Sequence, residues 1–387
     1  MSLRIALYLA LAVAVVNGFA RFAYALILPA MRDSLGWDYA AAGWLNTANS
    51  LGYAVGGLSG LLLLSKIKPS KLFITGLIST VCCIALVGVT TNLYAMLVWR
   101  FLAGVGSAWV FACGGALVAA YYRQSGAAIA VFFAGGGLGI ALSGLAVFPV
   151  LTGAMTWPQA WLTLGLAGAL LAVMPVLTVL RTQPEKAQAN RPETPLAANW
   201  QRRFAAQHRW IIAAYFCFGV GYIVYMTFVI AWLKQMRLSD VFSASLWVLM
   251  GIAAMASGWV WRIPLGSWHP AKTFAAATLC TALGSAIPIV MRQPVALMLS
   301  TVLVGGSFFM VPAAMTALAK QSLPQLGWAP AMNFFTMIFA VGQALGPVLA
   351  GFTADTYGLN AAMFLGAGVL LLSAGLALVQ PRKSAVS

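Results

Sequence analysis

The stretch NGFARFAYALILP, residues 17–29, lies inside the first long apolar run of the sequence and contains an arginine, Arg21. No acidic residue lies within ten positions of this arginine on either side. A charged side chain at the centre of a bilayer costs from about 3 to more than 10 kcal/mol. The whole chain is 62% hydrophobic and 7% charged, with a mean hydropathy of +0.92. Soluble domains carry about 25% charged residues, so most of this chain must lie in lipid, and Arg21 needs a function there.

Apolar runs recur twelve times along the 387 residues. Each is about 18–28 residues long, and about 20 residues suffice for a helix to cross the hydrocarbon of a bilayer. We therefore predict an all-α polytopic membrane protein with twelve transmembrane helices, at 5–30, 40–64, 72–91, 93–120, 127–151, 159–180, 210–233, 241–261, 273–291, 294–319, 328–353 and 360–379.

The basic residues are distributed unevenly between the two sides of the membrane. With twelve spans and an inner N-terminus, the inner segments hold 16 Lys and Arg and the outer segments hold 4. The positive-inside rule then places both termini in the cytoplasm of a bacterial inner membrane. The same rule explains the net charge of +16 without nucleic acid as a partner. The first run is too long and too interrupted by polar residues to be a cleaved signal peptide.

The sequence also divides into two similar halves. Gly18 and Gly219, Gly104 and Gly305, and the prolines at 69 and 270 are each separated by 201 positions. Such a shared offset indicates a parallel duplication of six helices, which secondary transporters show. We predict an N-terminal six-helix bundle at 1–180, a cytoplasmic linker at 181–209 and a C-terminal six-helix bundle at 210–387.

Two motifs carry a resemblance to a known family. LVWRFLAGVGSA, residues 97–108, is similar to the span-4 pattern of the major facilitator superfamily, and the stretch 18–29 resembles its YbfB/YjiJ-type subgroup. The resemblance implies two pseudo-symmetric bundles that transport by alternating access, with spans 1, 4, 7 and 10 lining a central cavity. The loop GLLLLSKIKPSK, residues 60–71, lacks the usual aspartate, and span 5 lacks the Gly-Pro pair of proton antiporters. Both departures argue against drug/proton antiport.

Two arginines are the strongest candidates for a binding site. Arg21 and Arg100 both lie about 10–14 Å below the predicted outer boundary, at 1.5 Å per residue. A guanidinium presents a planar fork that fits a carboxylate or phosphate, so the pair could form an anion clamp. Because Arg100 belongs to a superfamily-wide pattern, a structural or gating role is its alternative. Arg21 has no such alternative pattern, and we expect it to be the main substrate contact.

Polar residues around Arg21 extend this candidate site. Tyr24 lies three residues further on the same helical face, and Asn17 lies one turn earlier. At the repeat offset, Tyr222 corresponds to Arg21 and Tyr225 to Tyr24. A phenol combines an apolar body with a hydrogen-bonding tip, which suits a partly apolar anion. Packing against neighbouring helices is the alternative for each of them.

Small residues recur every four positions in three spans. Such a stripe allows helices to approach closely. In the resembled fold these spans form the contact between the halves, so we predict bundle contact and gating there, with static packing inside one half as the alternative. The glycines are Gly52, Gly56, Gly60, Gly135, Gly139, Gly342 and Gly346.

The predicted span cores contain no carboxylate or imidazole, and the six acids lie at span ends or in loops. No metal-ligand cluster, catalytic set or P-loop occurs, so we expect no metal, no cofactor and no enzymatic activity. We predict a monomeric, secondary active or facilitative transporter of a small organic anion. An efflux pump for amphiphilic or drug-like compounds is the alternative, in view of the 12% aromatic content and 16 Met. A non-transporting membrane sensor is less well supported, because a sensor is expected to carry an added soluble domain and the longest polar segment, 181–209, has 29 residues.

Overall fold

The computed structural model describes residues 3–64, 66–122, 125–182, 200–323 and 325–381. The described residues contain no strand, and twelve helices are long and apolar enough to cross a membrane, as predicted. The helices of the N-terminal bundle are α1 (Arg4–Val13), the π-helix η1 (Ala14–Phe22), α2 (Tyr24–Leu35), α3 (Tyr39–Leu64), α4 (Pro69–Val87), α5 (Leu93–Tyr121), α6 (Gly126–Ala146), α7 (Phe148–Leu151) and α8 (Trp157–Thr182). Those of the C-terminal bundle are α9 (Trp200–Gln207), α10 (Arg209–Gln235), α11 (Asp240–Val260), α12 (Arg262–Ser267), α13 (Pro270–Val290), α14 (Pro294–Gly305), α15 (Met310–Ser322), α16 (Gln325–Tyr357) and α17 (Leu359–Val379).

Local sequence signals set where several spans begin. Pro69, Pro270 and Pro294 each occupy the first turn of a helix, where a missing N–H removes no hydrogen bond. Asn92 caps α5 by accepting a hydrogen bond from the N–H of Ala95 at 3.1 Å. Ser239 caps α11 in the same way. The prolines at equivalent places in the two bundles agree with the repeat that the sequence indicates.

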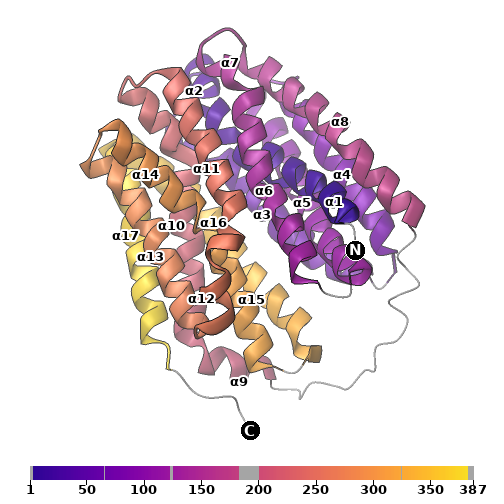
Figure 1. The fold of residues 1–387 in the computed structure, drawn as a ribbon. Coiled ribbons are helices and arrows are strands. Elements are labelled where there is room, and N and C mark those ends of the chain that lie inside the picture. Colours follow the sequence, from indigo (N-terminus) through magenta and orange to yellow (C-terminus); the bar gives the residue numbers. More distant parts are fainter. Residues whose placement is uncertain (1–2, 65, 123–124, 183–199, 324, 382–387) are drawn as a thin grey trace.

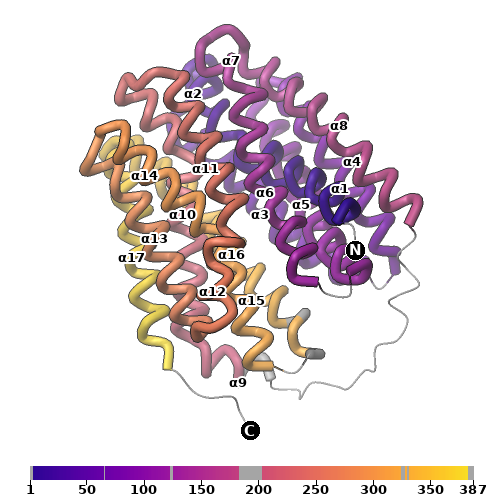
Figure 2. Tube along the Cα trace, in the orientation of Figure 1, coloured from indigo at the N-terminus to yellow at the C-terminus, as the bar shows by residue number. Residues whose placement is uncertain are grey.

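The two bundles are joined at one end and diverge at the other (Figures 1 and 2). The start of α1, the end of α17 and α9 lie at the open end, which we call the terminal face, whereas α7 lies at the opposite end, the far face (Figure 1). The most extensive contacts between the bundles are those of α3 with α16, of α6 with α11 and of α2 with α10. The two bundles therefore meet in the middle of the molecule.

The junction between the bundles is tight because small residues let the backbones approach. A Cβ on Gly351 would lie 2.5 Å from the carbonyl oxygen of Tyr39, and one on Gly137 would lie 2.6 Å from that of Gly251. The Asp355 carboxylate of α16 accepts hydrogen bonds from the N–H groups of Tyr39 and Ala40, both at 2.8 Å. One bundle therefore caps the first turn of a helix in the other.

The glycines at this junction differ from the seven that the four-residue stripes predict. The stripe glycines of α3 pack on α5, those of α6 pack on α1 and η1, and those of α16 pack on α10. The predicted contact between bundles is therefore corrected to contacts within a bundle for Gly52, Gly56, Gly60, Gly135, Gly139, Gly342 and Gly346. A stripe of small residues shows that some helix approaches closely, but it does not show which one.

Part of the predicted linker belongs to a folded element. Residues 183–199 lie outside the described part of the chain, but the segment after them forms α9. Phe204 of this helix is buried, with its ring centroid 5.8 Å from that of Phe335 in α16. α9 therefore packs on the C-terminal bundle.

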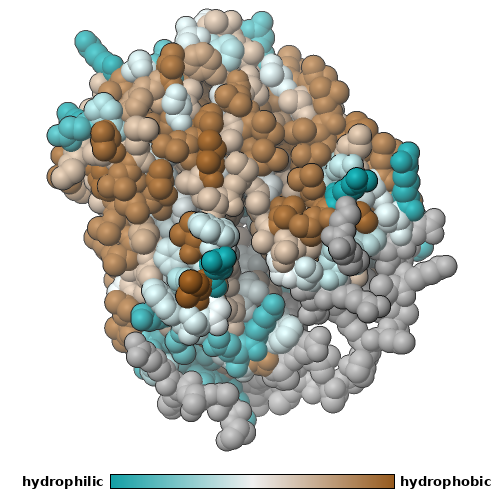
Figure 3. Space-filling view, in the orientation of Figure 1, coloured by the Kyte–Doolittle hydropathy of each residue, from teal (hydrophilic) through white to brown (hydrophobic). Residues whose placement is uncertain are grey.

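The surface agrees with a membrane environment. Apolar side chains cover most of the upper and middle surface in Figure 3, and hydrophilic ones gather at the two ends. Leu166, Leu170 and Trp259 are each more than 60% exposed. The same view shows a hollow between the two lobes in its lower half, which opens toward the terminal face (Figure 3).

Candidate functional site

The first span is interrupted by a π-helical segment, η1, that contains Asn17, Gly18 and Arg21. The N–H of Ala23 donates to the carbonyl oxygen of Gly18 at 2.8 Å, which is the i to i−5 bond of a π turn. Every residue of η1 is buried. π turns inside α-helices are frequent at functional sites because the wider turn redirects side chains. Here the turn lies at the middle of the molecule, between α5, α6 and the C-terminal bundle.

Arg21 is buried at the boundary between the two bundles, with 6% of its surface exposed. Its Nη2 donates a hydrogen bond to Oε1 of Gln343 in α16. Its guanidinium carbon lies 4.8 Å from the ring centroid of Tyr53 in α3 and 5.8 Å from that of Phe22. Its Nε is buried without an acceptor in the described part of the chain. In the described part of the chain, Asp33 forms ion pairs with Arg32 and Lys234, and Arg21 has no carboxylate partner.

Gln343 connects Arg21 to the C-terminal bundle. Its side chain is completely buried, and its Nε2 donates to the hydroxyl oxygen of Tyr222 in α10. The Tyr222 ring is nearly parallel to those of Phe218 and Phe339, at centroid distances of 5.1 and 5.5 Å. One amide therefore links a cation of one bundle to a phenol of the other.

Aromatic rings from both bundles surround this link. Phe22 contacts Phe308 and Phe309 edge-on, at 5.9 and 6.5 Å between centroids. Tyr53, Phe309 and Phe339 are partly exposed, whereas Tyr222 and Phe308 are buried. Asn17 lies beside them, since its amide nitrogen and the Phe309 ring both face Gly136. The surroundings of Arg21 are thus apolar faces with few polar atoms.

Arg100 lies on α5, and its contacts are inside the N-terminal bundle. It donates hydrogen bonds to the carbonyl oxygens of Ala20 and Leu45 and to the side-chain oxygen of Asn46. Its guanidinium also lies over the rings of Tyr24 and Trp161, at 5.1 and 5.5 Å. The contact with Ala20 anchors η1 one residue before Arg21. This geometry matches the structural alternative, because the hydrogen bonds of Arg100 in the described part of the chain all stay within one bundle.

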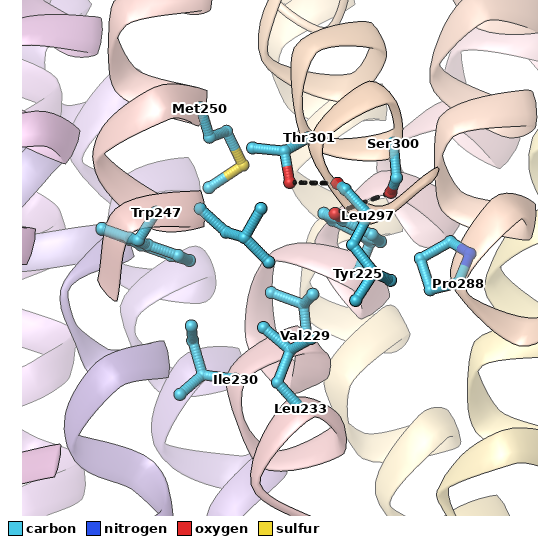
Figure 4. Close-up of a pocket in the computed structure, with 11 residues that line it drawn as sticks. Tyr225, Val229, Ile230, Leu233, Trp247, Met250, Pro288, Leu297, Ser300 and Thr301 are labelled. Carbon is cyan, nitrogen blue, oxygen red and sulfur yellow. Dashed lines mark hydrogen bonds between the residues drawn. The ribbon is translucent and has the colours of Figure 1, made fainter. Parts of the chain in front are cut away.

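The two remaining tyrosines of the predicted site also face elsewhere. Tyr24 donates a hydrogen bond to the carbonyl oxygen of Ala42 at 2.7 Å and stacks on Trp161. Tyr225 shares a hydrogen bond with Ser300 at 3.1 Å. It borders a small, mostly apolar pocket within the C-terminal bundle (Figure 4). Of the residues that the sequence predicts, the structure therefore brings together Arg21, Tyr222 and Asn17, and separates Arg100, Tyr24 and Tyr225 from them.

Sequence reasoning missed the polar residues that join the bundles beside Arg21. Asn46 donates to the hydroxyl oxygen of Thr227 at 2.6 Å, and Thr47 donates to the carbonyl oxygen of Ala344 at 2.6 Å. Gln343 was missed as well, although a glutamine in an apolar run is a signal. Its counterpart at the repeat offset is Leu142, so the duplication gives no second indication.

Comparison with known proteins identifies a family of membrane transporters and a solved transporter with the same fold. A family model described as "Uncharacterised MFS-type transporter YbfB" matches residues 12–378. A search of curated proteins finds no match. Among solved structures, the chain is similar to the nucleoside transporter NupG, at 16% identity and a TM-score of 0.75, over 99% of this chain and 100% of that one. A mutant of NupG matches at the same identity and TM-score, over 97% of this chain and 99% of that one. At this identity the similarity to NupG concerns the fold alone.

Proposed function

This chain belongs to the YbfB-type family of the major facilitator superfamily, and from that premise we propose that it transports a small organic anion by alternating access. The family supports membrane transport, as opposed to enzymatic catalysis. The substrate class is our inference from the surroundings of Arg21.

The observation that carries the proposal is the uncompensated charge of Arg21. Buried charges in proteins are normally paired, because an isolated one has lost its hydration without a replacement. Arg21 is 6% exposed, has one neutral acceptor in Gln343, and keeps an unpartnered Nε. An anion would supply the missing charge, and a carboxylate would offer two oxygens to the guanidinium fork.

The rings around Arg21 support an anion with an apolar body. Tyr53 and Phe309 come from different bundles and are both partly exposed near the guanidinium or its neighbour Phe22. Binding pockets for small molecules are mostly apolar, with a few polar groups that orient the ligand. An organic acid with an aromatic or other apolar body fits this combination.

The position of Arg21 supports alternating access. It lies where the bundles meet, because its guanidinium donates to Gln343 of α16, and the hollow between the lobes opens toward the terminal face (Figure 3). A ligand at Arg21 would therefore exchange with the terminal side in this conformation. By the distribution of basic residues, the terminal side is the cytoplasm of a bacterial inner membrane, so we propose that this is an inward-open state.

Two other classes of ligand can be distinguished from organic anions by the binding test described below. Amphiphilic compounds are favoured by the aromatic rings, and nucleosides are what the similar transporter NupG carries. Neither class needs a negative charge, so neither accounts for the unpaired guanidinium.

The test is the thermal shift of the purified protein with three ligand sets: aromatic and aliphatic carboxylates, cationic amphiphiles, and nucleosides. A ligand at 100 times its Kd raises stability by about 2.7 kcal/mol. We expect carboxylates to raise the unfolding midpoint of the native protein and of Arg209→Gln, an exposed arginine that serves as the matched control. Arg21→Gln should abolish that shift. Carboxylate shifts that survive Arg21→Gln, or shifts with nucleosides or amphiphiles alone, would contradict the proposal.

A further inference from the structure

Gln343 occupies an unusual position for a neutral side chain. It is completely buried in α16, and each end of its amide is used: Oε1 accepts from Arg21, and Nε2 donates to Tyr222. Arg21 belongs to the N-terminal bundle, and Gln343 and Tyr222 belong to the C-terminal bundle. The Gln343 amide therefore connects the two bundles through hydrogen bonds on both sides. Separation of these bundles would open the far face.

We propose that Gln343 holds the place of the ligand's carboxylate on Arg21, so that ligand binding releases the Arg21–Gln343–Tyr222 bridge. This inference rests on the proposed anion site at Arg21. It assigns Gln343 as the residue that competes with the ligand, and it assigns the ligand's charged group as a planar carboxylate.

The chemistry of the two groups makes the exchange favourable. A side-chain amide and a carboxylate are both planar and of similar size, but the amide is neutral and offers one acceptor oxygen. A carboxylate offers two oxygens and a negative charge, so it can accept two parallel N–H bonds from the guanidinium and also neutralise its charge. The unpartnered Nε of Arg21 is a donor that the amide leaves unused. A tetrahedral phosphonate shares the charge but not the planar shape.

Release of Gln343 would act directly on the contact between the bundles. The next residue, Ala344, accepts the hydrogen bond from Thr47 that also joins α16 to α3. A Cβ on Gly43, one turn before Thr47, would collide with the carbonyl oxygen of Pro347. The same stretch of α16 therefore contains Gln343, which competes with the ligand, and the residues that pack against α3. Replacement of the Gln343 amide by the ligand on Arg21 is thus coupled through one helix to separation of the bundles at the far face.

The experiment measures binding of benzoate and of phenylphosphonate to the native protein, Gln343→Glu and Gln343→Met. In Gln343→Glu a permanent carboxylate pairs with Arg21, so benzoate affinity should fall at least tenfold, while the unfolding midpoint without ligand rises. Gln343→Met has a similar length but no acceptor, so benzoate should bind at least as tightly as to the native protein. Phenylphosphonate should bind the native protein more weakly than benzoate.

The outcomes separate this inference from the proposed function. Native benzoate affinity in Gln343→Glu would overturn the competition, and so would a loss of benzoate binding in Gln343→Met, which would make Gln343 a direct ligand contact. Tighter binding of phenylphosphonate than of benzoate would overturn the assignment of a planar group. In each of these cases the anion site at Arg21 would stand. If benzoate, phenylphosphonate and the other carboxylates all fail to bind the native protein, the anion site at Arg21 itself is refuted.

Discussion

Two buried arginines on contacting helices, Arg21 on η1 and Arg100 on α5, have opposite surroundings. Arg100 donates to two carbonyl oxygens and one amide oxygen of its own bundle and lies beside two aromatic rings. Arg21 has one amide acceptor, from the other bundle, and a buried Nε without a partner. The difference shows how a buried cation can be classified: one whose donors are used inside a single rigid body stabilises that body, and one left incompletely paired between two moving bodies is available to a ligand.

The largest effect should come from removing the arginine that stabilises the bundle. Arg100→Gln would leave the carbonyl of Ala20, the carbonyl of Leu45 and the Asn46 oxygen without a charged donor, and an unsatisfied buried group costs about 1–3 kcal/mol. We expect a loss of at least about 3 kcal/mol in unfolding free energy, measured by thermal unfolding in detergent. Arg21→Gln should change stability by less than about 1 kcal/mol, since it removes a poorly paired charge. Equal destabilisation by both variants would break the comparison.

The second effect concerns ligand affinity at Arg21. Arg21→Lys keeps the charge but loses the planar fork, so it should bind a carboxylate about 1.5–3 kcal/mol less tightly, or roughly tenfold or more. The measurement is isothermal titration with benzoate. An unchanged affinity in Arg21→Lys would mean that only charge matters at this site.

A smaller effect distinguishes contacts within a bundle from contacts between bundles. Asp38 and Asp355 both cap the first turn of α3, but Asp38 precedes that helix and Asp355 comes from α16. Loss of a helix cap costs about 0.5–2 kcal/mol, so both changes to Ala should lower stability by a similar amount. Only Asp355→Ala should also favour opening of the far face.

That opening can be read from thiol labelling of a cysteine at position 344, which is 5% exposed at the bundle contact, in a background without the five native cysteines. Labelling should be faster in Asp355→Ala than in Asp38→Ala. Equal labelling rates would show that the cap of Asp355 does not hold the bundles together.

The smallest effect is a pH dependence at the terminal face. His208 is buried next to Phe204, and this burial lowers the pKa of its imidazole below the ordinary value of about 6.5. The folded state therefore favours the neutral ring, so its contribution to stability is present above the unfolded pKa and is lost as the pH falls below about 6.5. The unfolding midpoint should decline less between pH 7.5 and 5.5 in His208→Gln than in the native protein. An identical decline would assign the pH dependence to other groups.

Much of the fold could be predicted because its signals are local. The length of each apolar run predicts a span, and prolines such as Pro69 and Pro270 mark where helices begin. The π turn at Ala14–Phe22 could not be predicted, because it depends on how η1 packs against α6 at Gly18 and Gly139. The same limit applies to the stripe glycines, whose spacing indicates a close contact without naming the partner helix.

The sequence by itself determined that this chain is a twelve-span membrane protein with an unexplained charge at Arg21, because hydrophobicity, length and isolation of a charge are properties of single segments. Only the tertiary structure decided which arginine faces the other bundle. Arg100 and Arg21 look alike in the sequence, but the neighbours that distinguish them, Leu45 for one and Gln343 for the other, are 55 and 322 positions away. Whether a buried donor is satisfied depends on atoms that folding brings together, and that information exists only once the helices are packed.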